Sequence, residues 1–330
     1  MKIYSVPEKR WNSFLQSLLE TYRTYAPFLK YETVDYEELI PDKIDSIYYA
    51  SVKPTTPLKI FHFPVKENVV KATQKEQRII IGTPACDLAA LDLMDSIFLD
   101  DEFLDIYYKE NRENTIIFGK DCYGHDESCH CTSYGLTPYP QKNCDVIMSY
   151  DENNFYLQPI SGKGEKILSE FGLDKEETLE ELPYDVSKKR ETVKSDLDKH
   201  NQKLPDSEAT RKLVEREDKE ELWKKHAKTC VSCGACSTIC PTCHCFLLID
   251  RVGFEKIKNW DTCQHPDFER VAAGEDPLQK LYTRLRNRYL CKYSYKPDMF
   301  GEIACTGCGR CIEACIGEIN KNELIMEALE

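Results

Sequence analysis

The chain has 330 residues, with 57 acidic against 44 basic side chains and a formal net charge of -13 at pH 7. This acidic balance argues against nucleic acid as a partner, because phosphate binding needs a basic face. No stretch approaches the roughly 18 apolar residues that direct membrane insertion requires. The N-terminus also lacks the pattern of a secretory signal, so we expect the seventeen cysteines to be reduced thiols in the cytoplasm.

The first part of the chain predicts an α/β domain, which we expect to cover residues 1–172. Residues 2–6 predict a short strand, and apolar side chains at helical spacing over residues 11–22 predict a core helix. Residues 78–82 and 115–119 are β-branched runs typical of buried strands, with a helical stretch between them. Strand, loop, helix and strand in this order indicate a small α/β sheet.

Four cysteines follow the strands of this predicted sheet. Two of them stand directly after a strand, where ligands bind in open α/β sheets, and two lie on a loop that can fold back toward the first pair. These are Cys86, Cys122, Cys129 and Cys131. They can form an iron-sulfur cluster, or they can be free or zinc-bound thiols, because C-x6-C-x-C is not an established cluster run.

Residues 173–228 are charge-dense and contain no glycine, which indicates a linker or a set of exposed helices. Beyond them, two cysteine quartets share the spacing C-x2-C-x2-C-x3-C, the run that bacterial ferredoxins use for [4Fe-4S] clusters. The fourth cysteine of such a run binds the neighbouring cluster, so we expect crossed ligation. One cluster is expected on Cys230, Cys233, Cys236 and Cys315. The other is expected on Cys305, Cys308, Cys311 and Cys240.

Two structural zinc sites are the alternative for the quartets, although zinc modules usually divide their ligands into two separated pairs. The quartets are separated by 64 residues, which look helical. We therefore expect an α-helical two-cluster ferredoxin-like domain over residues 229–330, ending in a helix that Asn322 can cap, and an α+β chain as a whole. Within this segment, the basic run 284–288 is interpreted as a solvated helix face or a protein contact.

Three further cysteines lie among the quartets, namely Cys243, Cys245 and Cys263. We interpret them as the environment of a cluster, where polar contacts to sulfur tune its potential. An additional ligand set with His244 or His265 is the alternative. The remaining Cys144 and Cys291 are expected to be packing cysteines.

The sequence has neither the G-x-G-x-x-G pattern of a dinucleotide site nor the lysine motif of a P-loop. With 14 glycines in all, a flavin or nicotinamide site is not expected, and no catalytic residues are assigned. A stand-alone flavin- or substrate-binding oxidoreductase is therefore the least favoured hypothesis.

Several stretches resemble the iron-sulfur β subunit of soluble NAD(P)-linked [NiFe] hydrogenases, the sulfhydrogenases. They are KPTTP at 53–57, ACDLAAL at 85–91, CHC at 129–131, CVSCGACSTICPTCHCF at 230–246, and DTC and CTGCGRCIEAC further on. The corresponding subunit of anaerobic sulfite reductase is similar, with the same set of motifs. The sequence departs from the pattern at Ile316, where a proline is usual, and at His130, where an aromatic residue is usual.

The resemblance implies a non-catalytic electron-transfer subunit of an anaerobic oxidoreductase complex. It implies two [4Fe-4S] clusters on the quartets, and it favours a third on the four N-terminal cysteines. It also implies two kinds of partner. One is an FAD- and NAD(P)-binding diaphorase-type subunit, and the other is a catalytic subunit of hydrogenase type or, alternatively, of sulfite reductase.

Overall fold

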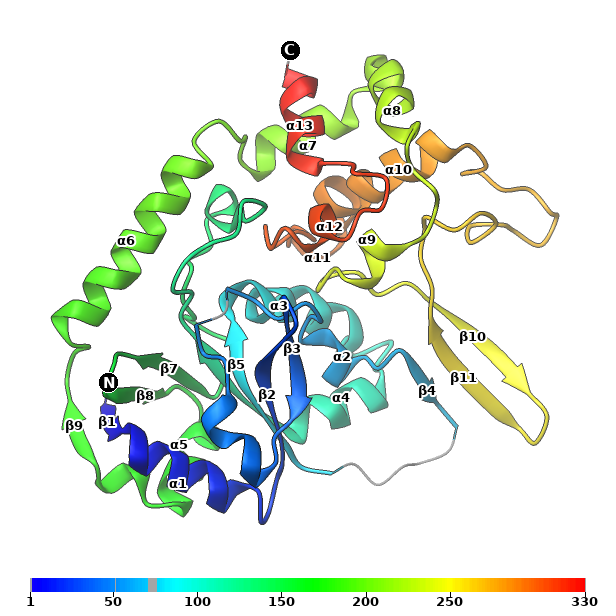
Figure 1. Ribbon diagram of the computed structural model, residues 1–330. Coiled ribbons are helices and arrows are strands. Elements are labelled where there is room, and N and C mark those ends of the chain that lie inside the picture. The colour runs from blue at the N-terminus through cyan, green and yellow to red at the C-terminus, as the bar shows by residue number, and fades with distance from the viewer. Residues whose placement is uncertain (1, 51, 71–75, 330) are drawn as a thin grey trace.

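The structure is a computed structural model that describes residues 2–50, 52–70 and 76–329. Figure 1 shows a large sheet with helices packed on it, a region of short helices and loops above the sheet, and a hairpin that projects to one side. The region above the sheet is formed by the C-terminal part of the chain. The expected α+β organisation is therefore confirmed.

The main sheet has eight strands in the order β3-β2-β5-β6-β7-β8-β1-β9. Its centre is parallel and consists of β2 (Arg23–Lys30), β5 (Arg78–Pro84), β6 (Thr115–Lys120) and β7 (Val146–Tyr150). Antiparallel strands flank this centre, namely β3 (Thr33–Glu38), β8 (Asn154–Pro159), β1 (Ile3–Pro7) and β9 (Glu177–Leu179). The strands predicted at 2–6, 78–82 and 115–119 are β1, β5 and β6, within a larger sheet than the sequence indicated.

Helices cover both faces of this sheet, so its central strands are apolar on both sides. Ile79 and Ile81 of β5 pack with α1 and α5 on one face, whereas Ile80 packs with α3 on the other. The predicted core helix is α1, although it ends at Leu18 and the buried Tyr22 lies beyond it. The helices that belong to this part are α1 (Glu8–Leu18), α2 (Lys59–His62), α3 (Ala85–Phe98), α4 (Ile106–Glu113) and α5 (Gly162–Glu170), with 3-10 turns at Pro41–Ser46 and Cys131–Tyr134.

The charge-dense segment after α5 forms helices, each of which buries one face. It contains a 3-10 turn (Leu173–Lys175), α6 (Tyr184–His200), α7 (Ser207–Glu215), a second turn (Glu217–Lys219) and α8 (Glu220–Ala227). In Figure 1, α6 runs along one side of the molecule from the sheet to the C-terminal region. The segment thus connects the two parts through a long helix whose Val193 and Leu197 are buried.

The C-terminal region contains short helices around the cysteine loops. They are α9 (Ala235–Thr238), α10 (Leu281–Leu290), a π-helical turn (Cys291–Tyr295), α11 (Lys296–Phe300), α12 (Arg310–Glu313) and α13 (Lys321–Leu329). The last helix begins one residue earlier than predicted, because Asn320 and not Asn322 provides the cap and accepts a hydrogen bond from the Asn322 N–H.

The segment between the quartets is helical only in its second half. Its first half forms a hairpin of β10 (Phe246–Arg251) and β11 (Glu255–Trp260), which pairs with β4 (Lys66–Asn68) from the N-terminal part. The expectation of a helical segment is wrong there. Gly253 and Phe254 adopt positive φ angles of 90° and 58° at the turn, which closes the hairpin.

A buried ion pair joins the two parts of the molecule. Arg310 of α12 donates two hydrogen bonds to Asp87 of α3, at 2.5 and 3.0 Å, and a third to the carbonyl of Pro54. Both side chains are almost fully buried. This pair fixes the C-terminal cysteine loops above the carboxyl ends of the central strands. Among the described residues, no helix has both the length and the apolar character that crossing a membrane demands.

Candidate metal centres

The two quartet loops have the same backbone conformation. In the first, Ser232 and Gly234 have φ angles of 54° and 74°, and in the second, Gly307 and Gly309 have φ angles of 65° and 76° at the equivalent positions. Left-handed residues on both sides of the second cysteine turn the backbone so that the first three thiols point inward. A one-turn helix, α9 or α12, then follows each loop and carries the third cysteine.

The structure brings the fourth cysteine of each run to the other run. One cavity is lined by thiols of Cys230, Cys233, Cys236 and Cys315, together with Cys311. A second cavity is lined by Cys240, Cys305, Cys308 and Cys311. These two groups correspond to the crossed sets that the ferredoxin spacing predicts.

The close approach behind this crossing needs a glycine at position 317. A Cβ atom there would lie 2.2 Å from the carbonyl oxygen of Thr229, directly before Cys230. The backbone after Cys315 can therefore lie against the start of the first quartet only without a side chain. No group of three or more His, Cys, Asp or Glu side chains in the described part of the chain is arranged to hold a single metal ion.

Buried cations surround the two cavities. Four of them make no ion pair with any carboxylate within the described residues, and each is at most 3% exposed. They are Lys59, Arg288, Lys292 and Lys321. Buried charges are normally paired, because an isolated charge in the protein interior is costly. The cavities they enclose therefore suit an anionic group, and thiolate-bound iron-sulfur clusters carry net negative charge.

Two of these cations contact the cysteine loops directly. Lys292 Nζ lies 3.2 Å from Cys240 Sγ and donates hydrogen bonds to Thr242 and to the carbonyl of Ala304. Burial by itself would lower the pKa of Lys292, but the neighbouring thiolates raise it well above its usual value. Arg288 donates to the carbonyl of Cys236 at 2.8 Å and lines both cavities. Both positive charges thus face the sulfur atoms.

Buried polar atoms without partners face the same cavities. Among the described residues, Arg288 Nε and Thr306 Oγ1 have no hydrogen-bond acceptor or donor in the structure. Both residues line the second cavity. Because buried polar groups are almost always hydrogen-bonded, these atoms require a further group in the cavity. Cluster sulfides accept such hydrogen bonds, so the residues present fit [4Fe-4S] clusters.

The four N-terminal cysteines also converge. Cys86 begins α3, Cys122 follows β6, and Cys129 and Cys131 precede and begin a 3-10 turn. Cys122 lies within electrostatic range of each of the other three thiols. Burial raises the pKa of the Cys122 thiol to about 11, and Lys53 Nζ lies 3.7 Å from Cys129 Sγ. The sheet thus collects four buried thiols beside one buried cation.

These N-terminal cysteines lie against the second quartet. The N–H of His130 donates to the carbonyl of Gly307 at 2.8 Å. A Cβ on Gly307 would come within 2.5 Å of the backbone of Cys131, so this contact requires a glycine. Cys86 lies within electrostatic range of Cys308. The N-terminal set, the second quartet and the first quartet therefore follow one another in space.

The additional cysteines of the C-terminal region form close pairs. The thiol of Cys243 is hydrogen-bonded to Cys240, and the thiol of Cys245 to Cys263. Cys291 lies near the second pair, although the sequence predicted a packing role. Cys144 does pack in the apolar core beside Leu88, Leu91 and Ile117.

The buried cations were not predicted from the sequence. Arg284 and Arg288 were interpreted as part of a solvated or protein-binding face, but they are only 6% and 3% exposed. Arg284 holds the segment around Cys263 by donating to the carbonyl of Gln264. The only signal in the sequence was the local excess of arginine in an acidic chain, which does not show the direction in which each side chain points.

The fold and the thiol-lined cavities define an iron-sulfur protein, and comparison with known families agrees. Residues 229–319 match the family described as a 4Fe-4S dicluster domain. Over 346 aligned positions, the chain is 26% identical to sulfhydrogenase 2 subunit beta from Pyrococcus furiosus, and the match covers all of this chain and 99% of the relative. The resemblance to the iron-sulfur β subunits of the hydrogenase family is thereby confirmed, and with it the coarse role of an electron-transfer iron-sulfur subunit with [4Fe-4S] clusters.

Proposed function

We propose that this chain relays electrons between a partner subunit that binds FAD and NAD(P) and the catalytic subunit of a cytoplasmic [NiFe] hydrogenase complex. The observation that carries the proposal is the arrangement of three adjoining thiol groups across two parts of the fold. Such a row suits electron transfer through a subunit. The full-length similarity to a sulfhydrogenase β subunit supports the hydrogenase assignment.

We further propose the ligands of the clusters. Cys230, Cys233, Cys236 and Cys315 would hold one [4Fe-4S] cluster, and Cys305, Cys308, Cys311 and Cys240 would hold the other. Cys86, Cys122, Cys129 and Cys131 would hold a third. When bound, these clusters supply one-electron redox chemistry.

The residues of this chain would determine how easily each centre accepts an electron. Lys292 and Arg288 place positive charge and N–H groups next to the quartet thiols, which favours the more negative, reduced state. The second quartet contains the buried Cys240 and Cys308, whereas Cys233 of the first quartet is exposed. The first quartet would therefore exchange electrons with a partner at the surface, and the second would act inside the chain.

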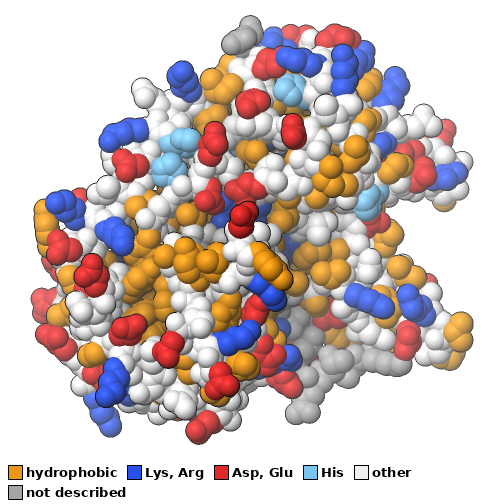
Figure 2. Space-filling view, viewed as in Figure 1, with side chains coloured by type: hydrophobic (Ala, Val, Ile, Leu, Met, Phe, Trp, Pro, Cys, Tyr) orange, Lys and Arg blue, Asp and Glu red, His pale blue; other side chains and the backbone are white. Residues whose placement is uncertain are grey.

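A surface hollow gives the N-terminal set its own access to a partner. This hollow of about 760 Å³ is lined by Lys53 and by four acidic side chains, Glu32, Asp126, Glu127 and Glu313. Figure 2 shows charged side chains of both signs over the viewed face, with several acidic ones near its centre. An acidic rim would complement a basic patch on a partner, and such complementarity mainly sets the rate and specificity of association.

The corresponding subunit of anaerobic sulfite reductase remains the second candidate, because its motif set is the same as the one in this chain. The two candidates share the relay and differ in the catalytic partner. Purification of the native complex without oxygen should decide between them. A co-purifying [NiFe] subunit is the expected result, whereas a sirohaem subunit would instead identify sulfite reductase.

Iron and acid-labile sulfide analysis tests the number of clusters in this proposal. The quartets alone would hold about eight irons per chain, and the N-terminal set would add about four, counting four per cubane. The variant Cys122→Ala should lose about four irons if the third site is filled. A chain prepared without oxygen that contains zinc and no iron would refute the proposal.

The crossed ligation has a sharper test. Under crossed ligation, Cys230→Ala and Cys315→Ala should abolish the same electron paramagnetic resonance signal of the reduced protein. Cys305→Ala and Cys240→Ala should abolish the other signal. If Cys230→Ala instead matches Cys240→Ala, each run binds its own cluster and the crossed assignment is wrong. Cys144→Ala serves as the control, because this thiol packs in the apolar core.

A further inference from the structure

Five of the seventeen cysteines are not used by the three proposed sites. One of them, Cys144, packs in the core of the sheet domain. The other four gather in one place, between the hairpin base, the start of the π-helical turn and the second quartet. They are Cys243, Cys245, Cys263 and Cys291.

Three of these thiols are mutual neighbours although they come from distant positions. Cys245 directly precedes β10, and its carbonyl accepts a hydrogen bond from the N–H of Asp261 at 3.0 Å. This contact closes the base of the hairpin and brings the thiols of Cys245 and Cys263 into hydrogen-bond contact. Cys291 begins the π-helical turn and lies within electrostatic range of both. The hairpin and the turn thus build a thiol group that no single segment contains.

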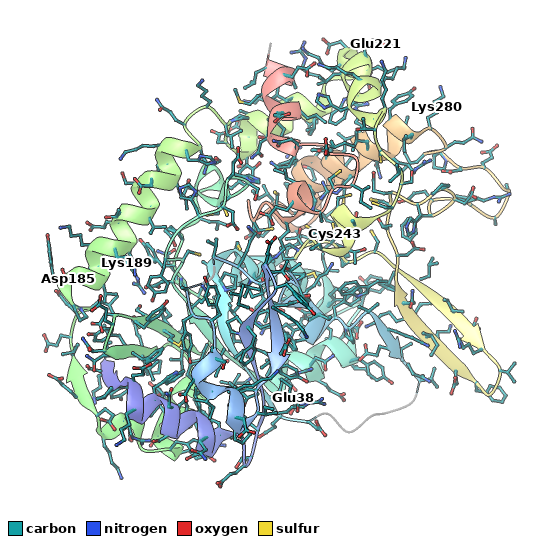
Figure 3. The ribbon with its side chains drawn as sticks, viewed as in Figure 1. Glu38, Asp185, Lys189, Glu221, Cys243 and Lys280 are labelled. Carbon is teal, nitrogen blue, oxygen red and sulfur yellow. The ribbon has the colours of Figure 1, made fainter. Side chains whose placement is uncertain are left out.

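Cys243 is the nearest remaining sulfur on the same strand-like segment. Figure 3 shows it where the C-terminal region meets the sheet domain. Lys59 donates to the Cys243 carbonyl at 2.9 Å and lies within electrostatic range of the thiols of both Cys243 and Cys245. The thiol of Cys243 also contacts Cys240, so this residue connects the group to the second quartet.

The two histidines nearby are not available as ligands. The ring nitrogens of His244 are both engaged, with the carbonyl of Thr242 at 3.1 Å and with Lys296 Nζ at 3.0 Å. The ring of His265 is bound to Asp261 at 2.7 Å, and its side chain is 45% exposed. The four thiols are therefore the donor atoms of this place.

The surroundings favour negative charge on these sulfurs. Lys292, Lys296 and Arg288 all lie within electrostatic range of Cys291. Gln264 Nε2 donates to Cys263 Sγ at 3.4 Å. The Trp260 ring lies 4.2 Å from Lys59 Nζ and packs on Phe63, so the place also has an apolar wall. Cationic side chains, an N–H donor and an apolar wall are the features that tune cluster potentials.

We propose that Cys243, Cys245, Cys263 and Cys291 form a fourth thiolate site, which binds a further iron-sulfur cluster. This site goes beyond the proposed relay, which needs only the other three. A single metal ion is not the ligand we infer, since no three candidate ligand residues of the described chain are arranged around one ion, at this place or at the quartets. A cubane takes four thiolates spread around a larger body.

The fourth site lies beside both quartets. Cys263 lies within electrostatic range of Cys236. A Cβ on Gly234 would lie 2.5 Å from the side chain of Thr262, so the first quartet loop packs directly on the segment before Cys263. Together with the contact between Cys243 and Cys240, this places the site at a branch of the row of thiol groups, not at its end.

Iron, sulfide and electron paramagnetic resonance measurements on the full chain, purified without oxygen, test this site. Cys245→Ala, Cys263→Ala and Cys291→Ala should each contain about four irons fewer than the unchanged protein and lack the same signal. The control Cys144→Ala should keep the full iron content. Gel filtration identifies which variants are folded, and Cys291→Ser gives a milder change of the same ligand.

Two results would overturn the fourth site. One is an unchanged iron and sulfide content in a folded variant of any of these residues. The other is a Cys245–Cys263 disulfide in peptide mass maps of the native protein, because a disulfide leaves no thiolate for iron. Failure of the relay would look different, since Cys230→Ala and Cys305→Ala would then leave the spectrum unchanged.

Discussion

The sheet domain and the cysteine-rich region are stabilised by different means. In the sheet domain, Trp11, Phe14 and Leu15 of α1 are fully buried against the central strands, and Trp11 stacks on Phe155 with ring centroids 4.9 Å apart. In the cysteine-rich region, thiols and cations occupy the centre, and the regular elements around them are short. Apolar burial is favourable without any ligand, whereas buried cations need an anionic partner.

This difference shows how the two parts divide the work. The sheet domain provides a preformed apolar body, and the ends of its strands present Cys86 and Cys122. The cysteine-rich region would depend on its clusters both for function and for structure, since a metal site can contribute folding free energy. Iron removal is therefore the most direct way to separate the two parts.

The largest expected effect follows removal of iron by oxidation and chelation. The region 229–319 should lose its protection against amide hydrogen exchange, because the buried charges of Arg288 and Lys292 would lose their counter-charge. The strands β5 and β6 should keep their protection. Exchange measured by mass spectrometry resolves the two regions. Equal protection of residues 229–319 before and after iron removal would show that apolar packing alone holds this region.

The next effect concerns the ion pair between the parts. Arg310→Met leaves the carboxylate of Asp87 buried and unpaired, and it should lower the free energy of unfolding by about 3–5 kcal/mol. Chemical denaturation under anoxic conditions measures this change. The double variant with Asp87→Leu should recover much of the loss, and Arg10→Met, at the partly exposed pair with Glu176, should cost about 0–1 kcal/mol. Equal losses for Arg310→Met and Arg10→Met would contradict a structural role of the buried pair.

A change confined to the apolar core should spare the metal sites. Leu18→Ala removes a fully buried side chain of α1 and should cost roughly 2–5 kcal/mol through lost burial and a cavity. The iron content of the purified protein should stay the same, because α1 does not contact the cysteine loops. Denaturation combined with iron analysis checks both parts of this prediction. Loss of iron in the folded variant would mean that the two regions are coupled more tightly than their separate cores indicate.

The smallest effect should appear in a redox potential. Lys292→Met removes a positive charge 3.2 Å from Cys240 Sγ, and the second cluster should become harder to reduce, by on the order of 100 mV. An anoxic redox titration followed by electron paramagnetic resonance measures the shift. Lys225→Met, which changes a surface lysine bound to Glu327, is the control. A shift of equal size in the control would assign the effect to net charge and not to the local contact.

Much of the site was predictable, because its strongest signals are local in the sequence. The C-x2-C-x2-C-x3-C spacing predicts the ligand type, since the backbone of a short loop determines which thiols can surround one cubane. Buried strands such as β5 were predictable for a similar reason, as continuous β-branched residues indicate burial on both faces. The sequence also led to the family resemblance through motifs spread along nearly the whole chain.

Contacts between distant segments were decided by the tertiary structure. The basic run did not show that Arg288 points into the cavities, because that direction depends on the packing of α10 against the cysteine loops. The hairpin was missed because its pairing with β4 connects residues far apart in the chain. Cys291 looked like a packing residue until the π-helical turn placed it beside Cys245 and Cys263.

The sequence by itself therefore determined which atoms can bind metal, and the tertiary structure decided how those atoms are grouped. Spacing along a loop is a short-range property that residue order specifies directly. Grouping depends on close approaches such as that of Gly307 to Cys131 and on the ion pair between Arg310 and Asp87. Such approaches join segments whose separation in the chain carries no geometric information, so they become visible only when the chain is folded.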